Sequence, residues 1–265
     1  MSPTPGHPHI FQTTDAFTEN NPVPGSPELQ IHGLNKLTLL DYPGHMACTV
    51  FTGQCNLRCP FCQNASLVLF PDSQPIITHN DFFDFLQKRR GKLEGVCVTG
   101  GEPTICAGLP DFLVRIKELG FAVKLDTNGT NPDMLARILD AGLADYAAMD
   151  IKSSPDGYAK ACGLKSMELA PIRASVQLLM QSRIPYEFRT TVVKELHDHD
   201  TFTAIGEWLH GASAYYLQAF EDSGELVCHF SSPGTQYHSY TRNELEAFLP
   251  LLTPHINQTA IRGLS

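Results

Sequence analysis

The sequence predicts an α/β fold, a partial (β/α)6 barrel of parallel strands with a site at the carboxyl-terminal edge of those strands. Three observations lead to this prediction. Apolar segments of strand length alternate with segments of helical period along most of the chain. Residues that favour helix ends flank several of the helical segments. Strands that return through helices form right-handed parallel units, and such sheets bind ligands at the carboxyl ends of their strands.

The strand pattern begins at Ile31. The segment IHGLNKLTLL, residues 31–40, has the composition of a strand, and the turn DYPG follows it from Asp41 to Gly44. The next apolar segment opens the barrel, and five more follow it at helix-sized intervals. The predicted barrel strands are residues 47–53, 94–99, 121–126, 145–151, 186–193 and 214–220.

Helical patterns separate these strands. Pro132 after Asn131 is a favoured helix start, and Gly120 is a favoured helix end. The predicted helices are residues 79–90, 109–119, 132–141, 171–183 and 200–210.

The last elements are a helix and a strand. Thr241, with Glu244 three residues later, has the pattern of a capping box and predicts one helix over residues 241–252. A short strand at residues 256–262 then ends the fold.

Composition excludes several classes of protein. The net charge of −9 and the pI of about 5.6 argue against a nucleic-acid partner. Eight cysteines in 265 residues are too few for a disulfide scaffold. The first residues lack the pattern of a secretory signal, and no apolar run is long enough to span a membrane. We therefore expect a cytoplasmic protein with free thiols, a flexible tail at residues 1–28 and one domain at residues 29–265.

Three cysteines follow the first barrel strand in the stretch TGQCNLRCPFCQN. Cys55, Cys59 and Cys62 have the spacing C-x3-C-x2-C, at the edge where the site is expected. Structural zinc sites use four ligands, commonly as two pairs, and no fourth cysteine is near in the sequence. Three thiolates would leave one iron of a [4Fe–4S] cluster open to a small molecule, which favours chemistry over electron storage.

This loop resembles that of the radical S-adenosylmethionine (radical SAM) superfamily, with Phe61 at the family's aromatic position. The resemblance implies a [4Fe–4S] cluster whose open iron binds S-adenosylmethionine (SAM). It also implies reductive cleavage of SAM to a 5′-deoxyadenosyl radical, which removes a hydrogen atom from the substrate. No further catalytic acid or base is then expected.

The stretch VTGGEPT ends the second barrel strand. Its two glycines let the backbone approach a ligand closely, although a plain strand-to-helix turn would have the same residues. Beside the cysteine loop it resembles the GGE motif of the family. That resemblance implies that Gly100, Gly101 and Glu102 bind the methionine amino group of SAM.

Charged residues also lie on later strands. Asp150 and Lys152 alternate along MDIK and so face one side of the strand, and Arg189 lies in FRTTVV. Buried charges are costly unless they meet each other or a ligand, so a structural ion pair and a ligand site both remain open. The stretch LDTNG, with Asp126 and Thr127, has the composition of a turn.

These stretches resemble the activating enzymes of glycyl-radical enzymes. The resemblance implies that Asp126, Thr127, Asp150, Lys152 and Arg189 bind SAM. Some members also bind a monovalent cation, for which Asp126 and Asp150 are the candidate ligands here.

Residues 31–262 are most similar to activators of anaerobic ribonucleoside-triphosphate reductase, although Ala65 replaces a common proline. The resemblance implies a radical SAM domain at residues 29–265, a glycyl-radical enzyme as partner and an electron donor such as flavodoxin or ferredoxin. Neither nucleic acid nor membrane is an expected partner. Two alternatives stay open. One is a radical SAM enzyme for a small molecule or peptide, and the other is a non-enzymatic iron–sulfur or zinc module.

Overall fold

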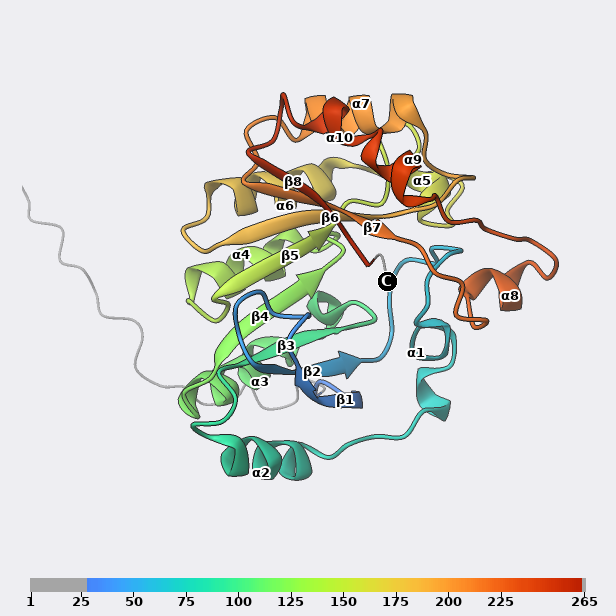
Figure 1. Ribbon diagram of the computed structural model, residues 1–265. Coiled ribbons are helices and arrows are strands. Elements are labelled where there is room, and N and C mark those ends of the chain that lie inside the picture. Colours follow the sequence, from blue (N-terminus) through green and yellow to red (C-terminus); the bar gives the residue numbers. More distant parts are fainter. Residues whose placement is uncertain (1–27, 264–265) are drawn as a thin grey trace, which may run out of the picture.

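The computed structural model describes residues 28–263, and these residues form one eight-stranded sheet (Figure 1). The strands lie in the sheet in the order in which they occur in the chain. This confirms the predicted α/β class. The strands are β1 (Ile31–Thr38), β2 (Ala47–Thr52), β3 (Gly95–Gly100), β4 (Ala122–Thr127), β5 (Tyr146–Asp150), β6 (Tyr186–Val192), β7 (Ala214–Ala219) and β8 (Gln258–Arg262).

The sheet is mainly parallel and does not close. Strands β2 to β8 pair in parallel, whereas β1 pairs with β2 in antiparallel fashion. Strands β1 and β8 are the two edges of this sheet. The six predicted barrel strands correspond to β2 to β7, and parallel pairing on β7 adds the predicted final strand, β8. Its sequence QTAIR is half polar, as suits an edge strand, and so lacks the apolar run of the inner strands.

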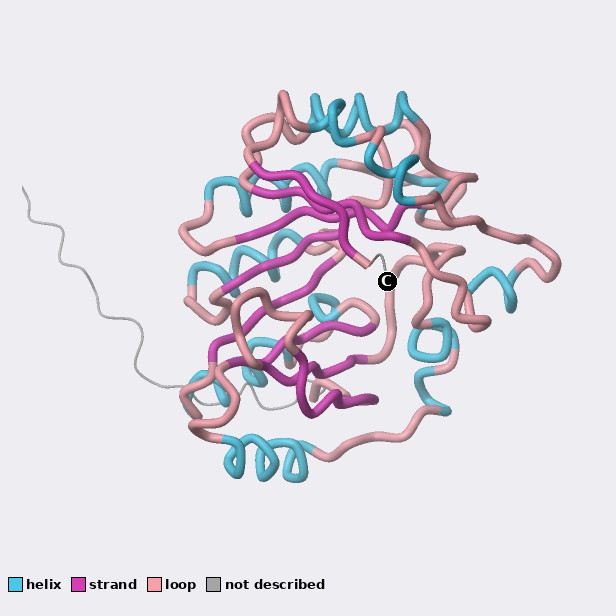
Figure 2. The backbone as a smooth tube through the Cα atoms, in the orientation of Figure 1, coloured by secondary structure: helices cyan, strands magenta, loops and turns pink. Residues whose placement is uncertain are grey.

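Helices cover the outer face of the curved sheet (Figure 2). The side chains of their inner faces and of the strands form one large core between the two layers. The helices are α1 (Ala65–Leu69), α2 (His79–Arg89), α3 (Leu109–Glu118), α4 (Pro132–Asp140), α5 (Tyr158–Ala161), α6 (Ala170–Gln181), α7 (His199–Trp208), α8 (Val227–Ser231), α9 (Arg242–Glu246) and α10 (Leu249–Leu252), with 3₁₀ turns at Pro71–Ser73 and Pro103–Ile105.

Local sequence explains the ends of several helices. The Asn131 side chain accepts a hydrogen bond from the Met134 backbone N–H, and Pro132 occupies the first helical position of α4. Gly120 follows the end of α3 with a φ of 88°, a conformation that glycine adopts without steric cost. These capping predictions are confirmed.

The helix predicted over residues 241–252 is two helices. Thr241 and Glu244 form the expected capping box at the start of α9. Pro250 lacks the N–H that a continuous helix would bond to the carbonyl of Glu246, so the helix ends and α10 begins a new turn. The prediction of one helix was therefore wrong, because it gave too little weight to this proline.

The predicted tail, residues 1–28, lies outside the described residues except for Glu28. Between residues 28 and 263 there is no helix with the length and apolar character needed to cross a bilayer.

Candidate functional site

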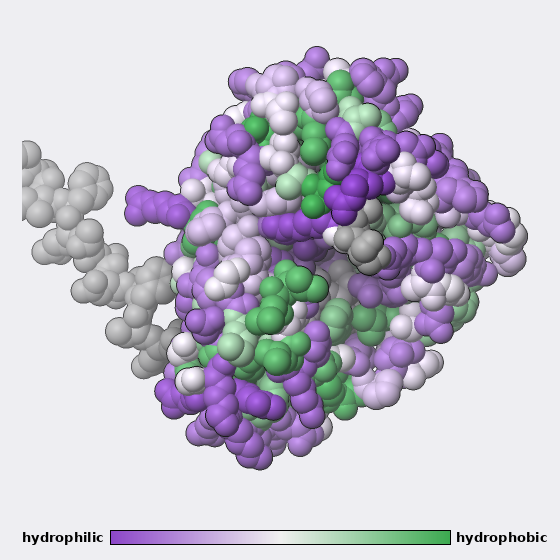
Figure 3. Space-filling model, viewed as in Figure 1, coloured by the Kyte–Doolittle hydropathy of each residue, from purple (hydrophilic) through white to green (hydrophobic). Residues whose placement is uncertain are grey.

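A pocket lies at the carboxyl-terminal edge of the parallel strands, where the fold predicts a site. Its volume is about 240 Å³. The side of the molecule that faces the reader is hollowed, with hydrophobic residues on both sides of the hollow (Figure 3). The pocket is lined by all the residues singled out from the sequence, namely Cys55, Cys59, Phe61, Cys62, Gly100, Gly101, Glu102, Asp126, Thr127, Asp150, Lys152 and Arg189.

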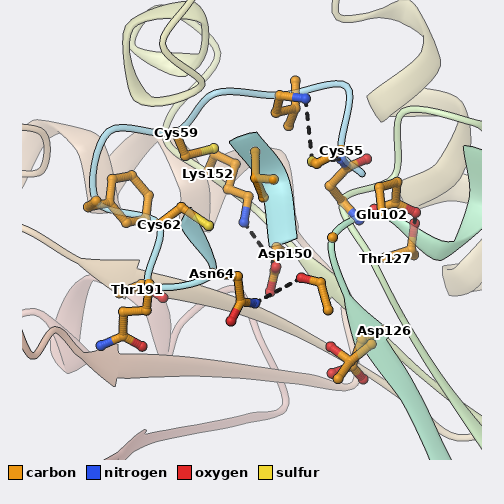
Figure 4. Close-up of a pocket in the computed structure, with 18 of the residues that line it drawn as sticks. Cys55, Cys59, Cys62, Asn64, Glu102, Asp126, Thr127, Asp150, Lys152 and Thr191 are labelled. Atoms are coloured by element: carbon orange, nitrogen blue, oxygen red, sulfur yellow. Dashed lines mark hydrogen bonds and ion pairs between the residues drawn. The ribbon is translucent and has the colours of Figure 1, made fainter. Parts of the chain in front are cut away.

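The cysteine loop follows β2 and forms part of the pocket wall. Gln54 has a φ of 62°, the one positive φ of a non-glycine residue between residues 28 and 263. The Cys62 backbone N–H donates to the carbonyl of Cys59 at 3.0 Å and closes the tight turn between these two ligand candidates. The three sulfur atoms face the pocket from different parts of the loop (Figure 4).

The three thiols line the same pocket. Within the described part of the chain, no three His, Cys, Asp or Glu side chains are grouped closely enough for one metal ion. A structural zinc ion needs its ligands at about 2.0–2.3 Å from one centre. A four-iron cluster is larger than one ion, so its cysteine ligands stand further apart.

Burial affects all three thiols. It raises the pKa of Cys55 to about 12 and raises that of Cys62. A hydrogen bond with Cys162, followed by burial, raises the pKa of Cys59. The positive charge of Lys152 acts in the opposite direction on each of them.

Cys162 is thus part of the surroundings of the cysteine loop. It is buried behind Cys59, and its carbonyl accepts the Arg58 backbone N–H at 3.1 Å. Its distance of about one hundred residues along the chain from Cys59 gave no signal of this contact.

Gly100 and Gly101 bring the end of β3 against the cysteine loop. A Cβ atom on Gly101 would lie 1.7 Å from the carbonyl oxygen of Gln54, and one on Gly100 would lie 2.4 Å from the backbone nitrogen of Thr52. The Gly101 N–H donates to the carbonyl of Thr52 at 2.9 Å. The two glycines therefore allow β3 to approach the backbone of Thr52 and Gln54 closely. Both glycines also line the pocket.

Glu102 joins the ends of β3 and β4. Its side chain is 1% exposed and accepts hydrogen bonds from Thr104, from the Thr127 hydroxyl at 2.7 Å and from the Asn128 N–H at 2.6 Å. Burial raises the pKa of this carboxyl, and the hydrogen bonds oppose that rise. Glu102 places a carboxylate on the pocket wall. That it binds the amino group of SAM stays a prediction.

Five charged side chains, on β4, on β6 and at and just after the end of β5, form a continuous series, which we call the charge row. Its members, in order of contact, are Lys124, Asp126, Arg189, Asp150 and Lys152. The Asp126–Arg189 contact is 3.0 Å (Oδ2 to Nη2), the Arg189–Asp150 contact 2.6 Å (Nε to Oδ1), and the Asp150–Lys152 contact 2.9 Å (Oδ2 to Nζ). Three cations against two carboxylates leave one net positive charge.

The charge row keeps its carboxylates ionised. Burial alone would raise the pKa of Asp126, but Arg189 and Lys124 outweigh burial and hold it below its usual value. Arg189 and Lys152 do the same for the pKa of Asp150. Each oxygen of both carboxylates is already paired with a cationic group of the protein. This arrangement argues against Asp126 and Asp150 as ligands of a monovalent cation.

His197 supports both Lys152 and the cysteine loop. Its Nδ1 accepts the Val193 N–H at 2.9 Å, and its Nε2 donates to the carbonyl of Lys152 at 2.8 Å. Its ring lies edge-on to Phe61, with 6.4 Å between centroids. Burial lowers the pKa of His197 to about 4, so the ring is neutral near pH 7.

Sequence reasoning missed Lys124, His197 and Cys162 as neighbours of the site. Lys124 had a signal, because it lies two residues before Asp126 and so on the same face of β4. His197 precedes Asp198, the residue that caps the start of α7. Its buried position under the pocket comes from tertiary packing alone.

Comparison with known proteins identifies relatives by sequence. The profile of the Radical SAM superfamily matches residues 49–205. A Methanocaldococcus jannaschii protein, provisionally named a glycyl-radical enzyme activating enzyme, is 30% identical over 72% of this chain and 80% of its own length. A GTP 3′,8-cyclase of Helicobacter pylori is 26% identical over 56% of this chain and 47% of its own.

Solved structures show the same fold. SuiB of Streptococcus suis, bound to its precursor peptide SuiA, has a TM-score of 0.60 at 13% identity over 79% of this chain and 47% of its own. TYW1 with a lysine-pyruvate adduct has a TM-score of 0.53 at 14% identity over 78% of this chain and 73% of its own. The chain spans about half the length of SuiB and of the GTP cyclase, so these likenesses concern the barrel.

Proposed function

The chain belongs to the radical SAM superfamily, and we propose that it is an activating enzyme that creates a glycyl radical on a partner enzyme. The proposed partner is an anaerobic ribonucleoside-triphosphate reductase, and the proposed electron donor is a flavodoxin or ferredoxin. What carries the proposal is a pocket that joins three cysteine thiols to a charge row with one net positive charge.

The residues of the pocket suit a [4Fe–4S] cluster and SAM. Cys55, Cys59 and Cys62 are the cysteines that line it, so one iron would lack a protein ligand. The charge row suits a carboxylate such as that of SAM, and Glu102 suits its amino group. When bound, the reduced cluster and SAM would supply the 5′-deoxyadenosyl radical that removes a hydrogen atom from glycine.

The chain's own residues would position the cofactor and exclude water. Arg189 and Lys152 would hold the carboxylate while Asp150 keeps both cations in place. Phe61 and Leu57, both largely buried, give the cysteine loop an apolar side. In this arrangement no side chain has to act as a separate acid or base.

A relative that matches over most of its own length favours an activating enzyme over a small-molecule enzyme. The Methanocaldococcus jannaschii protein matches over 80% of its own length, whereas the GTP cyclase match covers 47% of that enzyme. The open sheet, with edges at β1 and β8, also leaves a side from which a loop of a partner protein can enter. A radical SAM enzyme acting on a small molecule or peptide remains the second candidate.

The direct test is electron spin resonance. Reconstituted protein, reductant and SAM are mixed without oxygen with an anaerobic ribonucleotide reductase from the same genome. We expect a glycyl doublet, absent when the acceptor glycine of the reductase is replaced by alanine. Cleavage of SAM without a doublet would exclude this partner and favour the small-molecule candidate.

The cysteine ligands are tested by metal content. Replacing Cys55, Cys59 or Cys62 singly with alanine is expected to abolish cluster assembly, measured as iron and sulfide per chain. Cys48→Ala is the matched control, because Cys48 is buried in the core and does not line the pocket. Full iron content in any of the three ligand variants would refute the assignment.

A further inference from the structure

We propose that Lys124 is a positioning residue of the cofactor site, whose ammonium group fixes Asp126 and thereby leaves Arg189 available to the cofactor carboxylate. The inference rests on the proposed function only in requiring that the pocket binds SAM. Neither the family match nor the named relatives assign a role to this lysine.

Lys124 is sealed in the barrel beside the pocket. Its side chain is 1% exposed, and it is one of the largest fully buried side chains of the described residues. Its Nζ contacts Oδ1 of Asp126 and lies 3.8 Å from the sulfur of Cys97. A buried ammonium is costly unless a charged partner compensates it, and Asp126 is the carboxylate that does so.

Asp126 connects this hidden cation to the pocket. Asp126 lines the pocket, whereas Lys124 is not among the residues that line it. One carboxylate oxygen of Asp126 meets Lys124, and the other meets Arg189 at 3.0 Å. Lys124 therefore makes its connection to the pocket through Asp126 and, beyond it, Arg189.

Charge counting shows what Lys124 adds. Arg189 and Lys152 would be balanced by Asp126 and Asp150 if Lys124 were absent, and the charge row would be neutral. With Lys124, the row has one net positive charge facing the pocket. If Lys124 were removed, Arg189 would be the main counter-charge of Asp126. Arg189 would then attract an anionic ligand less strongly.

A purely structural role for Lys124 makes a different prediction. In that case its loss would weaken ligand binding only by loosening the barrel, and the effect would persist whatever residue stands at position 126. A positioning role through Asp126 predicts that Lys124 has no effect on binding once the Asp126 charge is gone. A double-mutant cycle separates these two cases.

The experiment measures the Kd of SAM by calorimetry on the full-length, reconstituted protein without oxygen and without a partner. Lys124→Met is expected to weaken SAM binding by roughly tenfold or more, whereas Asp126→Asn, which releases Arg189 from that carboxylate, is expected not to weaken it. The double variant is expected to bind SAM no more weakly than Asp126→Asn alone. Lys117→Met, which removes a half-exposed lysine paired with Asp145, is the matched control and should bind as the wild type does.

Two results would overturn the inference. One is a Lys124→Met protein whose Kd lies within roughly twofold of the wild-type value. The other is a further loss when Lys124→Met is added to Asp126→Asn. If Lys124→Met does not fold, the double variant, which has no unpaired buried charge, is compared with Asp126→Asn, and a further loss of SAM affinity in the double variant overturns the inference.

Chemical rescue gives a second readout. Lys124→Ala leaves space beside Asp126, so ethylammonium or potassium is expected to restore part of its SAM affinity while leaving the wild type and Lys117→Met unchanged. Equal effects on all three proteins would count against the inference. Wild-type protein that binds SAM but forms no glycyl radical would refute the proposed partner and leave the role of Lys124 intact.

Discussion

The absence of a side chain at Gly101 allows the end of β3 to pack directly against the cysteine loop. Because a Cβ there would lie 1.7 Å from the Gln54 carbonyl oxygen, Gly101→Ala must push the cysteine loop away from β3. We expect a loss of stability of about 1–3 kcal/mol and a marked fall in iron content. Iron analysis and urea unfolding of the reconstituted protein measure both effects.

Gly142→Ala is the control for Gly101→Ala. Gly142 has a φ of 64°, but a Cβ there would meet no atom within 4 Å. Its replacement should cost about 1–2 kcal/mol through backbone strain and leave iron content unchanged. Equal iron content in both variants would show that contact between the two loops is not required for cluster assembly.

His197 links stability to pH. Its pKa is about 4 in the folded protein, below the ordinary value of 6.5, because the ring is buried. The unfolded chain therefore binds a proton that the folded chain does not between these pH values. The stability contributed by neutral His197 is complete above about pH 6.5 and declines as the pH falls toward 4, by up to about 1.4 kcal/mol per pH unit.

Urea unfolding at several pH values tests this link. The free energy of unfolding of the wild type should fall more steeply between pH 6.5 and 4.5 than that of His197→Gln. Identical slopes would mean that other groups account for the acid sensitivity.

At the scale of elements, helix α8 binds the cysteine loop through two backbone hydrogen bonds. The Val227 N–H donates to the carbonyl of Cys62 at 3.1 Å, and the Cys228 N–H donates to that of Pro60 at 2.9 Å. Val227→Pro removes the first donor at a helix position that tolerates proline. We expect the cluster to be lost to a chelator roughly fivefold faster, as the loss of one hydrogen bond implies.

Val227→Ala separates this hydrogen bond from apolar packing. Val227 also packs against Ala65 and Val68, and the alanine variant loses that contact but keeps its N–H. Chelation should therefore be faster in Val227→Pro than in Val227→Ala. The same rate in both would assign the effect to packing.

The long elements could be predicted, whereas the short ones could not. The strands and helices of the β/α units can be recognised from the spacing of their apolar residues. The barrel fold then predicts that Cys55, Glu102 and Asp150 lie at the same edge of the sheet. Helices α1, α5 and α8 have only four or five residues, too few for a helical period to be recognised. The contacts of Cys162 and His197 arise between segments far apart in the chain, which pattern alone does not reveal.

At the scale of the whole molecule, an internal ion pair secures the last strand. Arg262 on β8 binds both carboxylate oxygens of buried Glu187 on β6, at 2.7 and 2.9 Å, and lies over the Tyr216 ring. Arg262→Ala would leave that carboxylate unpaired except for the Tyr146 hydroxyl. Since Arg262 is partly exposed, we expect a loss of about 2–3 kcal/mol rather than the full cost of a buried pair.

Chemical unfolding measures that loss. Arg242→Ala is the control, because Arg242 is exposed and its contact with Glu246 is 3.9 Å long. It should change stability by about 0.5 kcal/mol or less. Similar losses in the two arginine variants would show that β8 does not depend on Glu187.

The order of the strands, which is the same in the sheet as in the chain, has a consequence for synthesis on the ribosome. Each new strand can dock on the edge left by its predecessor, so the growing polypeptide need not wait for distant segments. Asp126 and Asp150 emerge before Arg189. The nascent chain thus carries Asp126 with Lys124 and Asp150 with Lys152, but lacks their shared guanidinium until β6 arrives, so a ribosome stalled before that strand would hold a chain whose charge row has no net charge.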